Sequence, residues 1–364
     1  MKITRIPVLT LHLIIGLLLF SECKGKMTDE SNTTDPVVDK YANPLKVVAT
    51  FPVGTVMSLS TFSNAPALAT VKKEFSSVTC ENAMKIAATQ PSATTFTFTE
   101  ADSITNYCIR NGIRLHGHNL VWHQSLPSWL TAFQGDSAAF ENILKTRIKT
   151  MLTHFKGRVK SWDVVNEAFS DDGTLRAFAT GTNTNTSLWA QKLGKDYVAR
   201  CFQYAHEADP DAKLFYNDYG QEYSSAKTSA ILAMVADFKK RGIPIDGIGL
   251  QFHTNIQRSD ANLTNAITQM ASTGLLIHIS ELDISMNGSQ TYTQPTSAML
   301  DLQKSKMNTI AAFYKTIPVA QQFGITFWGI SDANSWIKND WPLLFDATFA
   351  KKPAYYGFWD GLKN

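Results

Sequence analysis

The sequence has few cysteines, and this scarcity excludes two kinds of small-domain scaffold. Its 364 residues contain four, Cys23, Cys80, Cys108 and Cys201. The last three are an odd and sparse set, which is not a disulfide framework, and their spacings match no zinc site. We therefore expect Cys80, Cys108 and Cys201 to be small buried side chains.

An excess of charge of one sign is also lacking. Lys and Arg total 34 against 31 Asp and Glu, so the formal net charge is only +3, and no long basic run occurs. Nucleic acid is therefore a poor candidate for the ligand, and a large uncharged substrate fits this charge balance better. The sequence implies no protein partner.

The N-terminus carries a targeting segment. Lys2 and Arg5 precede an apolar stretch at about residues 8–20. A basic start followed by an apolar core of about a dozen residues is typical of a secretory signal, and such a core is too short to span a bilayer comfortably. We assign residues 1–22 to a signal peptide, so we expect a secreted or extracytoplasmic protein.

The segment after the signal leaves two alternatives open. Cys23 stands where a bacterial lipoprotein is cleaved and acylated, but Glu22 is not the small residue usual before such a site. A lipid anchor at Cys23 would make a surface protein, whereas simple cleavage would release it. Residues 23–43 are rich in Thr, Ser, Asp, Asn and Lys, and are expected to form a flexible tether. Residues 44–364 then form one domain, for which a hydrophobic content of 44% is sufficient.

From residue 45 onward, short β-branched or aromatic runs alternate with helical patterns. Strands are predicted at 51–58, 75–80, 113–121, 161–167, 212–218, 247–253, 275–283 and 324–330. The clearest helix, at 139–156, repeats its apolar residues at i, i+3 and i+4. Another is predicted at 187–208, ending before an Asp-Pro pair.

This order predicts the α/β class with a single (β/α)8 TIM barrel. A doubly wound open sheet is the alternative, and it would be expected to have a Gly-rich phosphate-binding turn after its first strand. The first strand instead runs into the sequence STFS at 60–63, which favours the barrel.

Residues able to do chemistry gather at the predicted carboxyl ends of the strands, where barrel active sites form. They are Glu81, Asn82, His118, Trp122, His123, Asn166, Glu167, Asn217, Asp218, Tyr219, Gln251, His253, Glu281, Asp283 and Trp328. Any one of these residues could simply be a solvated or helix-capping side chain. That explanation does not account for such residues at the ends of seven strands.

Two glutamates stand out by their context. Glu167 ends the run WDVVNE, and Glu281 lies within IHISELD. Buried glutamates are costly unless paired or used, and few basic residues flank these two. Their strands lie on opposite sides of a barrel mouth, so the carboxyl groups could face each other at about 5–5.5 Å, the separation in retaining glycosidases. One would protonate the leaving oxygen and the other attack the sugar, with His253 and Asp283 holding the nucleophile ionised.

Aromatic residues beside these acids indicate the ligand. Trp122, Trp328, Trp336 and Tyr219 lie in or just beyond the strand ends. Core packing is the usual role of a tryptophan. Flat aromatic faces beside acids and amides are, however, typical of a carbohydrate cleft.

With these motifs, the chain from about residue 45 to its C-terminus resembles family 10 glycoside hydrolases, whose type activity is endo-β-1,4-xylanase. The motifs that carry the resemblance are FSSVTCENAMK from Phe75, LHGHNLVWHQSLPSW from Leu115, WDVVNEAF from Trp162, LFYNDY from Leu214, DGIGLQFH from Asp246, ISELD from Ile279 and FWGISDANSWI from Phe327. Two residues depart from the family pattern, Cys80 for a frequent proline and Ile86 for a frequent tryptophan.

The resemblance implies roles for individual residues. Glu167 would be the acid/base and Glu281 the nucleophile, with Asn166 holding the sugar 2-hydroxyl, His253 bonding to the nucleophile and Asp283 supporting His253. The glycone-side wall would comprise Glu81, Asn82, Lys85, His118, Trp122, Gln251, Trp328 and Trp336, and Tyr219 would be an aglycone-side platform. The family also suggests a cis peptide between His118 and Asn119. No cofactor or metal is required by this chemistry.

The activity so implied is that of a retaining endo-1,4-β-xylanase acting on xylan or xylo-oligosaccharides. One alternative is hydrolysis of another β-1,4-glycan, such as cellulose or mixed-linkage glucan. Trp328 and Trp336 are expected to crowd the space that the hydroxymethyl group of glucose would need, which argues against this alternative. A second alternative is a non-catalytic glycan-binding protein, and the presence of both Glu167 and Glu281 argues against it.

Overall fold

The computed structural model describes residues 39–176 and 186–364, of which residues 40–364 form one compact unit. The predicted signal peptide at 1–22, Cys23 and most of the predicted tether lie outside the described residues. The domain begins slightly before the predicted boundary at 44. Residues 40–43, predicted as tether, pack on the C-terminal helix, where the Trp359 indole donates to the Asn43 carbonyl at 3.0 Å.

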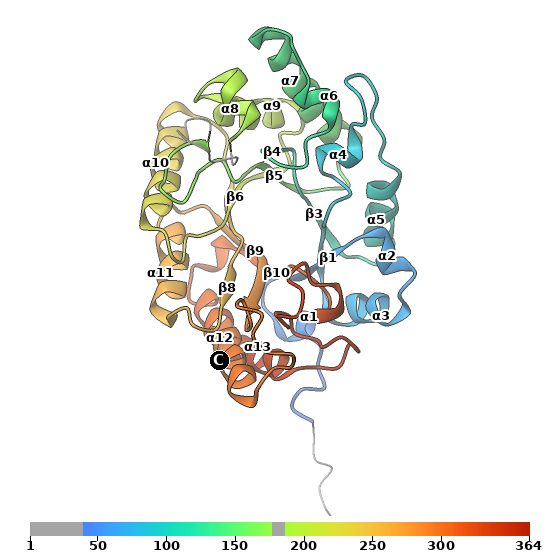
Figure 1. The fold of residues 1–364 in the computed structure, drawn as a ribbon, viewed down its shortest axis with the longest axis vertical. Coiled ribbons are helices and arrows are strands. Elements are labelled where there is room, and N and C mark those ends of the chain that lie inside the picture. The colour runs from blue at the N-terminus through green and yellow to red at the C-terminus, as the bar shows by residue number, and fades with distance from the viewer. Residues whose placement is uncertain (1–38, 177–185) are drawn as a thin grey trace, which may run out of the picture. The chain divides into compact units, whose positions relative to one another are not determined.

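Eight parallel strands close into a barrel (Figure 1). They are β1 Val53–Met57, β2 Ser77–Cys80, β3 Arg114–Gly117, β5 Ser161–Asn166, β6 Lys213–Asp218, β7 Gly247–Leu250, β9 Leu276–Ser285 and β10 Gln322–Phe327. Each strand pairs with the next along the chain, and β10 pairs in parallel with both β9 and β1. The predicted TIM barrel is confirmed, with strands at all eight predicted places.

Two predicted strands are broken near their carboxyl ends. The strand predicted at 113–121 is β3 followed by the short β4 Val121–Trp122, and the peptide between His118 and Asn119 in the gap is cis, as the family resemblance suggested. The strand predicted at 247–253 is β7 followed by β8 His253–Asn255, separated at Phe252 with φ of 58°.

Helices surround the barrel (Figure 1). They are α1 Leu45–Val48, α2 Leu59–Phe62, α3 Ala65–Glu74, α4 Ile86–Thr89, α5 Thr99–Arg110, α6 Ser128–Thr131, α7 Ser137–Phe155, α8 Leu188–Leu193, α9 Tyr197–Ala208, α10 Ser225–Arg241, α11 Asp260–Ala271, α12 Ser297–Tyr314 and α13 Pro353–Lys363, with the 3-10 turns η2 Val319–Gln321 and η3 Asp332–Asn334. The helix predicted at 187–208 is two helices, because Gly194 ends α8 with a φ of 76°. Within the described ranges, no helix is long and apolar enough to cross a bilayer.

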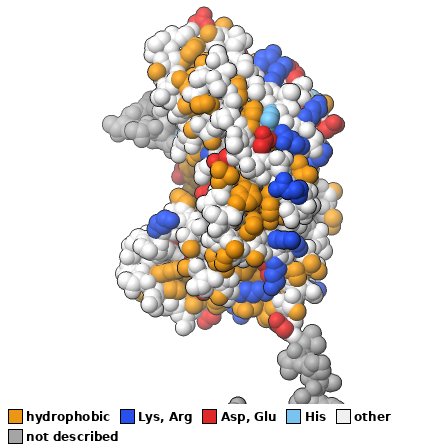
Figure 2. All heavy atoms as spheres, turned by 90° about the vertical axis from the view of Figure 1, so that its right-hand side faces the viewer, with side chains coloured by type: hydrophobic (Ala, Val, Ile, Leu, Met, Phe, Trp, Pro, Cys, Tyr) orange, Lys and Arg blue, Asp and Glu red, His pale blue; other side chains and the backbone are white. Residues whose placement is uncertain are grey.

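The interior of the barrel is packed rather than hollow. Four rings, those of His116, Phe215, His278 and Phe323, contact one another there with centroids 4.5–6.1 Å apart. Cys80, Cys108 and Cys201 are free and buried, as predicted. On the face that α3 and α5 cover, Lys and Arg side chains are interspersed with uncharged and apolar ones (Figure 2).

Candidate active site

A cleft of about 470 Å³ lies at the carboxyl ends of the strands. Its lining residues are Glu81, Asn82, Lys85, His118, Trp122, Gln124, Asn166, Glu167, Tyr219, Tyr223, Gln251, His253, Glu281, Trp328 and Trp336. All the residues predicted to act on or bind the sugar line this cleft except Asp283, which contacts the cleft through His253. His123, Asn217 and Asp218, also expected at the strand ends, do not line it. Gln124 and Tyr223 also line the cleft and were not predicted.

Glu281, on β9, is a buried carboxylate with two donors. Asn217 Nδ2 donates to its Oε1 at 2.7 Å, and His253 Nε2 lies 3.2 Å from its Oε2. Burial alone would raise the pKa of Glu281, but the hydrogen bond from His253 and the nearby His118 lower it below its usual value. Glu281 is therefore ionised at neutral pH, as a nucleophile must be.

His253, on β8, lies between two carboxylates. Its Nδ1 is 2.8 Å from Asp283 Oδ2, and the Trp336 indole donates to the same oxygen at 2.8 Å. Burial disfavours charge on the imidazole, but Asp283 and Glu281 outweigh burial and raise the pKa of His253 well above its usual value. Both ring nitrogens then carry protons, so His253 donates one hydrogen bond to each carboxylate.

Glu167, at the end of β5, receives different donors. Trp122 Nε1 donates to its Oε2 at 2.9 Å, while Gln251 Nε2 and Asn166 Nδ2 donate to its Oε1 at 2.9 and 3.2 Å. These three donors are neutral, whereas a charged imidazole bonds to Glu281. The carboxyl groups of Glu167 and Glu281 are thus held in distinct electrostatic environments, the arrangement that an acid and a nucleophile require.

The backbone at Glu167 is in the left-handed region, with φ of 56°. This conformation costs free energy for a residue with a side chain and is kept only where the surroundings enforce it. Here the Glu167 N–H donates to the Asn217 carbonyl at 2.8 Å, and Arg176 Nε donates to the Glu167 carbonyl at 2.6 Å. The turn directs the Glu167 side chain into the cleft.

Two amides connect the carboxyl groups. Asn217 Nδ2 donates to Glu281 and also to Asn166 Oδ1 at 2.8 Å, and the Nδ2 of Asn166 bonds to Glu167. Ser280 fixes the amide of Asn217 by donating to its Oδ1 at 2.6 Å. Asn217 ends a predicted strand, but only the structure shows that it bridges the two sides of the site.

Asp163 supports the floor of the cleft. Its two oxygens lie 2.8 Å from His118 Nδ1 and 3.0 Å from His116 Nε2. Burial opposes ionisation, but the two histidines lower the pKa of Asp163 far below its usual value. Sequence reasoning missed this residue, although an acid in the middle of the apolar run WDVVNE was a usable signal.

Aromatic rings border the cleft. Trp328 is 9% exposed, whereas Trp336 is 57% and Tyr223 43% exposed. Trp328 meets the His118 ring edge-on at 5.2 Å between centroids. Lys227 Nζ lies 3.3 Å from the centre of the Tyr219 ring. The cleft therefore presents both a fixed buried indole and exposed aromatic surface.

Lys227 and Asp218 form a buried pair next to this aromatic wall. Both side chains are fully buried, with Nζ 3.2 Å from Asp218 Oδ1 and 2.9 Å from Asp171. Burial raises the pKa of Asp218 to about 6, and Lys227 and Tyr216 limit the rise. In the described part of the chain, no three His, Cys, Asp or Glu side chains are grouped so as to hold a metal ion.

Comparisons with known proteins agree with this geometry. The model of the family described as "Glycosyl hydrolase family 10" matches residues 45–360. The chain is 37% identical to endo-1,4-beta-xylanase A of Thermoanaerobacterium saccharolyticum and 36% identical to endo-beta-1,4-xylanase Xyn10C of Cellvibrio japonicus, in each case over 86% of its length. It spans only 27% and 56% of those two proteins. A solved structure of a variant of xylanase 10C from Cellvibrio japonicus in complex with xylopentaose has a TM-score of 0.83 and 34% identity, covering 88% of this chain and 69% of that one.

Proposed function

Because the chain belongs to glycosyl hydrolase family 10, we propose that it hydrolyses internal β-1,4-xylosidic linkages of xylan by a retaining double displacement. One observation carries this proposal. Glu167 and Glu281 reach the same cleft from opposite strands of the barrel, and they are bound by different kinds of donor. The xylopentaose bound by the similar Cellvibrio protein supports xylan as the substrate.

In the first step, the Glu281 carboxylate attacks the anomeric carbon as the bond from that carbon to the leaving oxygen breaks. Glu167 donates its proton to this oxygen, so the aglycone leaves as a neutral alcohol. A covalent glycosyl ester on Glu281 results. The imidazolium of His253 and the amide of Asn217 keep Glu281 ionised and oriented for the attack.

In the second step, Glu167 removes a proton from a water molecule as the water oxygen attacks the same carbon. The ester bond to Glu281 breaks and the carboxylate is regenerated. Two inversions at one carbon leave the β configuration unchanged. The carboxyl groups of Glu167 and Glu281 should therefore lie about 5–5.5 Å apart, because a wider gap would admit water for single displacement.

Trp328 and Trp336 favour a xylose backbone over a glucose backbone. Both indoles line the cleft, and the bond from Trp336 to Asp283 fixes one of them beside His253. Xylose carries only hydrogens at carbon five, whereas glucose carries a hydroxymethyl group that these rings would crowd. Cellulose and mixed-linkage glucan are therefore the less favoured substrates.

The test is release of reducing sugar from xylan, carboxymethylcellulose and mixed-linkage glucan, measured side by side. Xylan should be cleaved fastest, and proton NMR during turnover should show a β product first. Glu281→Ala is the control for contaminating activity. Release from a glucan at a rate equal to that from xylan, or an initial α product, would overturn the proposal.

We further propose that residues 1–22 direct the protein out of the cytoplasm. The support is the basic start and apolar core of this segment. Fractionation of cells that express the full chain should find the protein outside the cytoplasm. Removal of residues 2–22 should retain it inside, and labelling with a radioactive fatty acid would distinguish a lipid anchor at Cys23 from simple release.

A further inference from the structure

Arg147, on α7, is a fully buried cation without an acidic partner. Within residues 39–176 and 186–364, no carboxylate pairs with its guanidinium, and burial lowers the pKa of Arg147 to about 9 with no acid to oppose the shift. The side chain still carries its charge at neutral pH. A buried charge without a counter-charge is costly, so its presence has to be explained by what it binds.

The guanidinium donates four hydrogen bonds, all to neutral oxygens. Nε donates to the Leu120 carbonyl at 2.6 Å, and Nη1 donates to the Thr89 hydroxyl at 2.9 Å. Nη2 donates to the carbonyls of Met84 and Asn119 at 3.1 and 3.2 Å. Two of these acceptors lie in the segment that follows β2, and two lie between β3 and β4. Arg147 therefore ties these two segments to each other.

Both segments carry side chains that line the catalytic cleft. Lys85 directly follows Met84, and its ammonium donates to Asn82 at 2.8 Å. The same ammonium lies 5.0 Å from the centre of the Trp122 ring, which belongs to the other segment. That segment also contributes His118 to the cleft. The spacing between these side chains thus depends on how the two segments are held together.

Thr89 connects the guanidinium to Lys85 by a second route. The buried Thr89 hydroxyl accepts from Arg147 and donates to the Lys85 carbonyl at 2.9 Å. Arg147 therefore holds the backbone on both sides of Lys85, through Met84 before it and through Thr89 after it.

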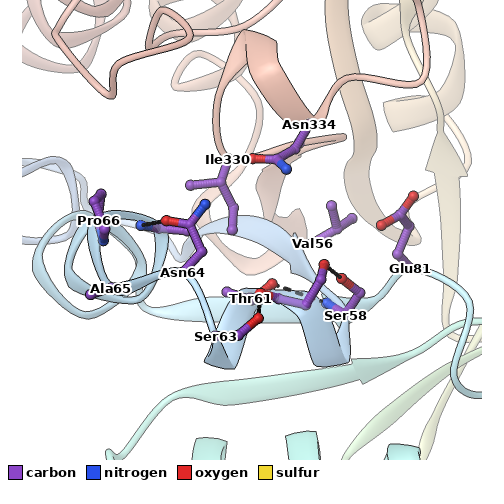
Figure 3. A pocket seen from close by; sticks show the side chains of 13 residues that line it. Val56, Ser58, Thr61, Ser63, Asn64, Ala65, Pro66, Glu81, Ile330 and Asn334 are labelled. Carbon is purple, nitrogen blue, oxygen red and sulfur yellow. Dashed lines mark hydrogen bonds between the residues drawn. The ribbon is translucent and has the colours of Figure 1, made fainter.

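The segment after β2 has open space on two sides where it leaves the strand. Glu81 lines the catalytic cleft, and it also lines a neighbouring pocket of about 510 Å³ (Figure 3). The other walls of this pocket are the segments after β1 and after β10. With open space on two sides, packing around Glu81 does little to fix the segment. Its position depends on contacts further along the chain, where Arg147 binds it.

We propose that Arg147 is a positioning residue of the active site, which holds Lys85 and His118 at the spacing that a sugar on the glycone side requires. This inference rests on the proposed function. Arg147 does not line the cleft, so it acts on the sugar only through the residues that it holds. The planar fork of a guanidinium can bond to acceptors in two segments at once, whereas the donors of a lysine radiate from a single atom.

Arg147→Lys tests this role, because it keeps the charge and removes the fork. Arg114→Lys is the matched control. The guanidinium of Arg114 is also largely buried and donates to the Ser77 hydroxyl at 3.1 Å and the Phe323 carbonyl at 2.9 Å, but it lies at the start of β3, away from the cleft. For an unbranched aryl xylobioside, kcat/KM should fall about tenfold in Arg147→Lys and less than about twofold in Arg114→Lys. Urea titration of both variants verifies that the enzyme is folded under the assay conditions.

A double-mutant cycle separates positioning from general damage to the fold. If Arg147 acts through Lys85, Arg147→Lys should lower kcat/KM less than about threefold when Lys85 is already replaced by Ala. In a Trp336→Ala background it should still lower kcat/KM about tenfold, because Trp336 follows β10 and belongs to neither segment. An equal loss in all three backgrounds, or no loss in the wild-type background, would overturn the inference.

Thr89→Val tests the same connection with Arg147 left in place. Thr105→Val is its matched control, because Thr105 is equally buried and also donates to the carbonyl four residues before it, but is not bonded to Arg147. Thr89→Val should lower kcat/KM about threefold or more, and Thr105→Val should change it less than about 1.5-fold. Equal kinetics for the two variants would contradict the inference. A wild-type enzyme inactive on xylan would instead overturn the proposed function.

Discussion

Tyr216 connects its neighbour Asp218 to the turn that carries the acid/base residue. The Tyr216 hydroxyl donates to Asp218 Oδ2 at 2.5 Å and accepts from the N–H of Ala168 at 3.0 Å. Ala168 directly follows Glu167, whose backbone is in the left-handed region. The phenol of Tyr216 therefore holds one end of the turn that aims Glu167 into the cleft.

Tyr216→Phe should loosen this turn. We expect a loss of about 1–3 kcal/mol in the free energy of unfolding, because two buried polar groups lose their partner. Tyr314→Phe is the matched control, since the buried Tyr314 hydroxyl also bridges a carbonyl and an N–H. Only Tyr216→Phe should also lower kcat for substrates with poor leaving groups. Identical kinetics for the two variants would show that Tyr216 is merely structural.

The roles of the two glutamates can be separated by the leaving group. Glu167→Ala should strongly lower the rate of xylan cleavage. It should leave the rate of the first step unchanged for aryl xylosides whose leaving group needs no proton. Glu281→Ala should abolish both reactions, because no covalent intermediate can form. Burst kinetics with an aryl xylobioside measure the first step directly. An equal loss on both substrates for Glu167→Ala would reverse or exclude the assignments.

His253→Asn should change how activity depends on pH. The hydrogen bond from His253 lowers the pKa of Glu281, so the nucleophile stays ionised as the pH falls. Without this bond the pKa of Glu281 rises, and the acid limb of kcat/KM should move upward by about one pH unit or more. The exposed His206, replaced by Asn, is the control. An acid limb that stays in place would mean that His253 does not set the ionisation of Glu281.

Trp328→Ala and Trp336→Ala should each lower activity on xylan, because aromatic contact with the sugar is lost. Each should also narrow the preference for xylose over glucose, as removal of an indole makes room for the hydroxymethyl group. The measurement is kcat/KM for aryl xylobioside and aryl cellobioside. Tyr292→Ala is the control, since Tyr292 is 50% exposed but does not line the cleft. If kcat/KM falls by the same factor for both substrates, other residues determine the selectivity. Glu81, Asn82 and Lys85 are then the next candidates.

Glu222 should make the fold less stable at neutral pH than in acid. Its side chain is 3% exposed, neither carboxyl oxygen has a hydrogen-bond partner among the described residues, and burial raises its pKa to about 7. The folded protein holds this proton more tightly than the unfolded chain, so the free energy of unfolding falls as the pH rises from about 4 to about 7.

Glu222→Gln should remove this dependence, because the amide does not ionise. Above about pH 8 the variant should exceed the wild type by roughly 3 kcal/mol in the free energy of unfolding, and below about pH 4 the two should agree. Urea titrations at several pH values measure the difference. Parallel curves for the two proteins would show that Glu222 is ionised in the fold at neutral pH.

The sequence predicted the barrel because each strand is an apolar run followed by residues typical of an active site. It predicted the cleft for a related reason: side chains such as Glu81, Gln251 and Trp328 follow successive strands, and parallel strands present their carboxyl ends on one side. That argument requires only the order of the elements along the chain.

What the sequence did not reveal depends on contacts between distant segments. The left-handed turn at Glu167 has no glycine to signal it and is enforced by bonds to Asn217 and Arg176. Tyr223 reaches the cleft from a loop after β6, outside any strand pattern. The break between α8 and α9 is the exception, because Gly194 is a local sign of it: a glycine within a helical pattern indicates a helix end.

The packing of residues 40–43 on α13 brings the two ends of the domain together. Lys40 Nζ lies 3.1 Å from Asp360, and the Tyr41 ring contacts Tyr356 at a tilt and Trp359 edge-on. A short peptide could therefore join Asn364 to Lys40, and new termini could be opened in an exposed loop on the far side of the ring. A circular permutant of this kind would keep every strand in its place and the same cleft. The order in which the segments are synthesised would then be a free choice for an engineer.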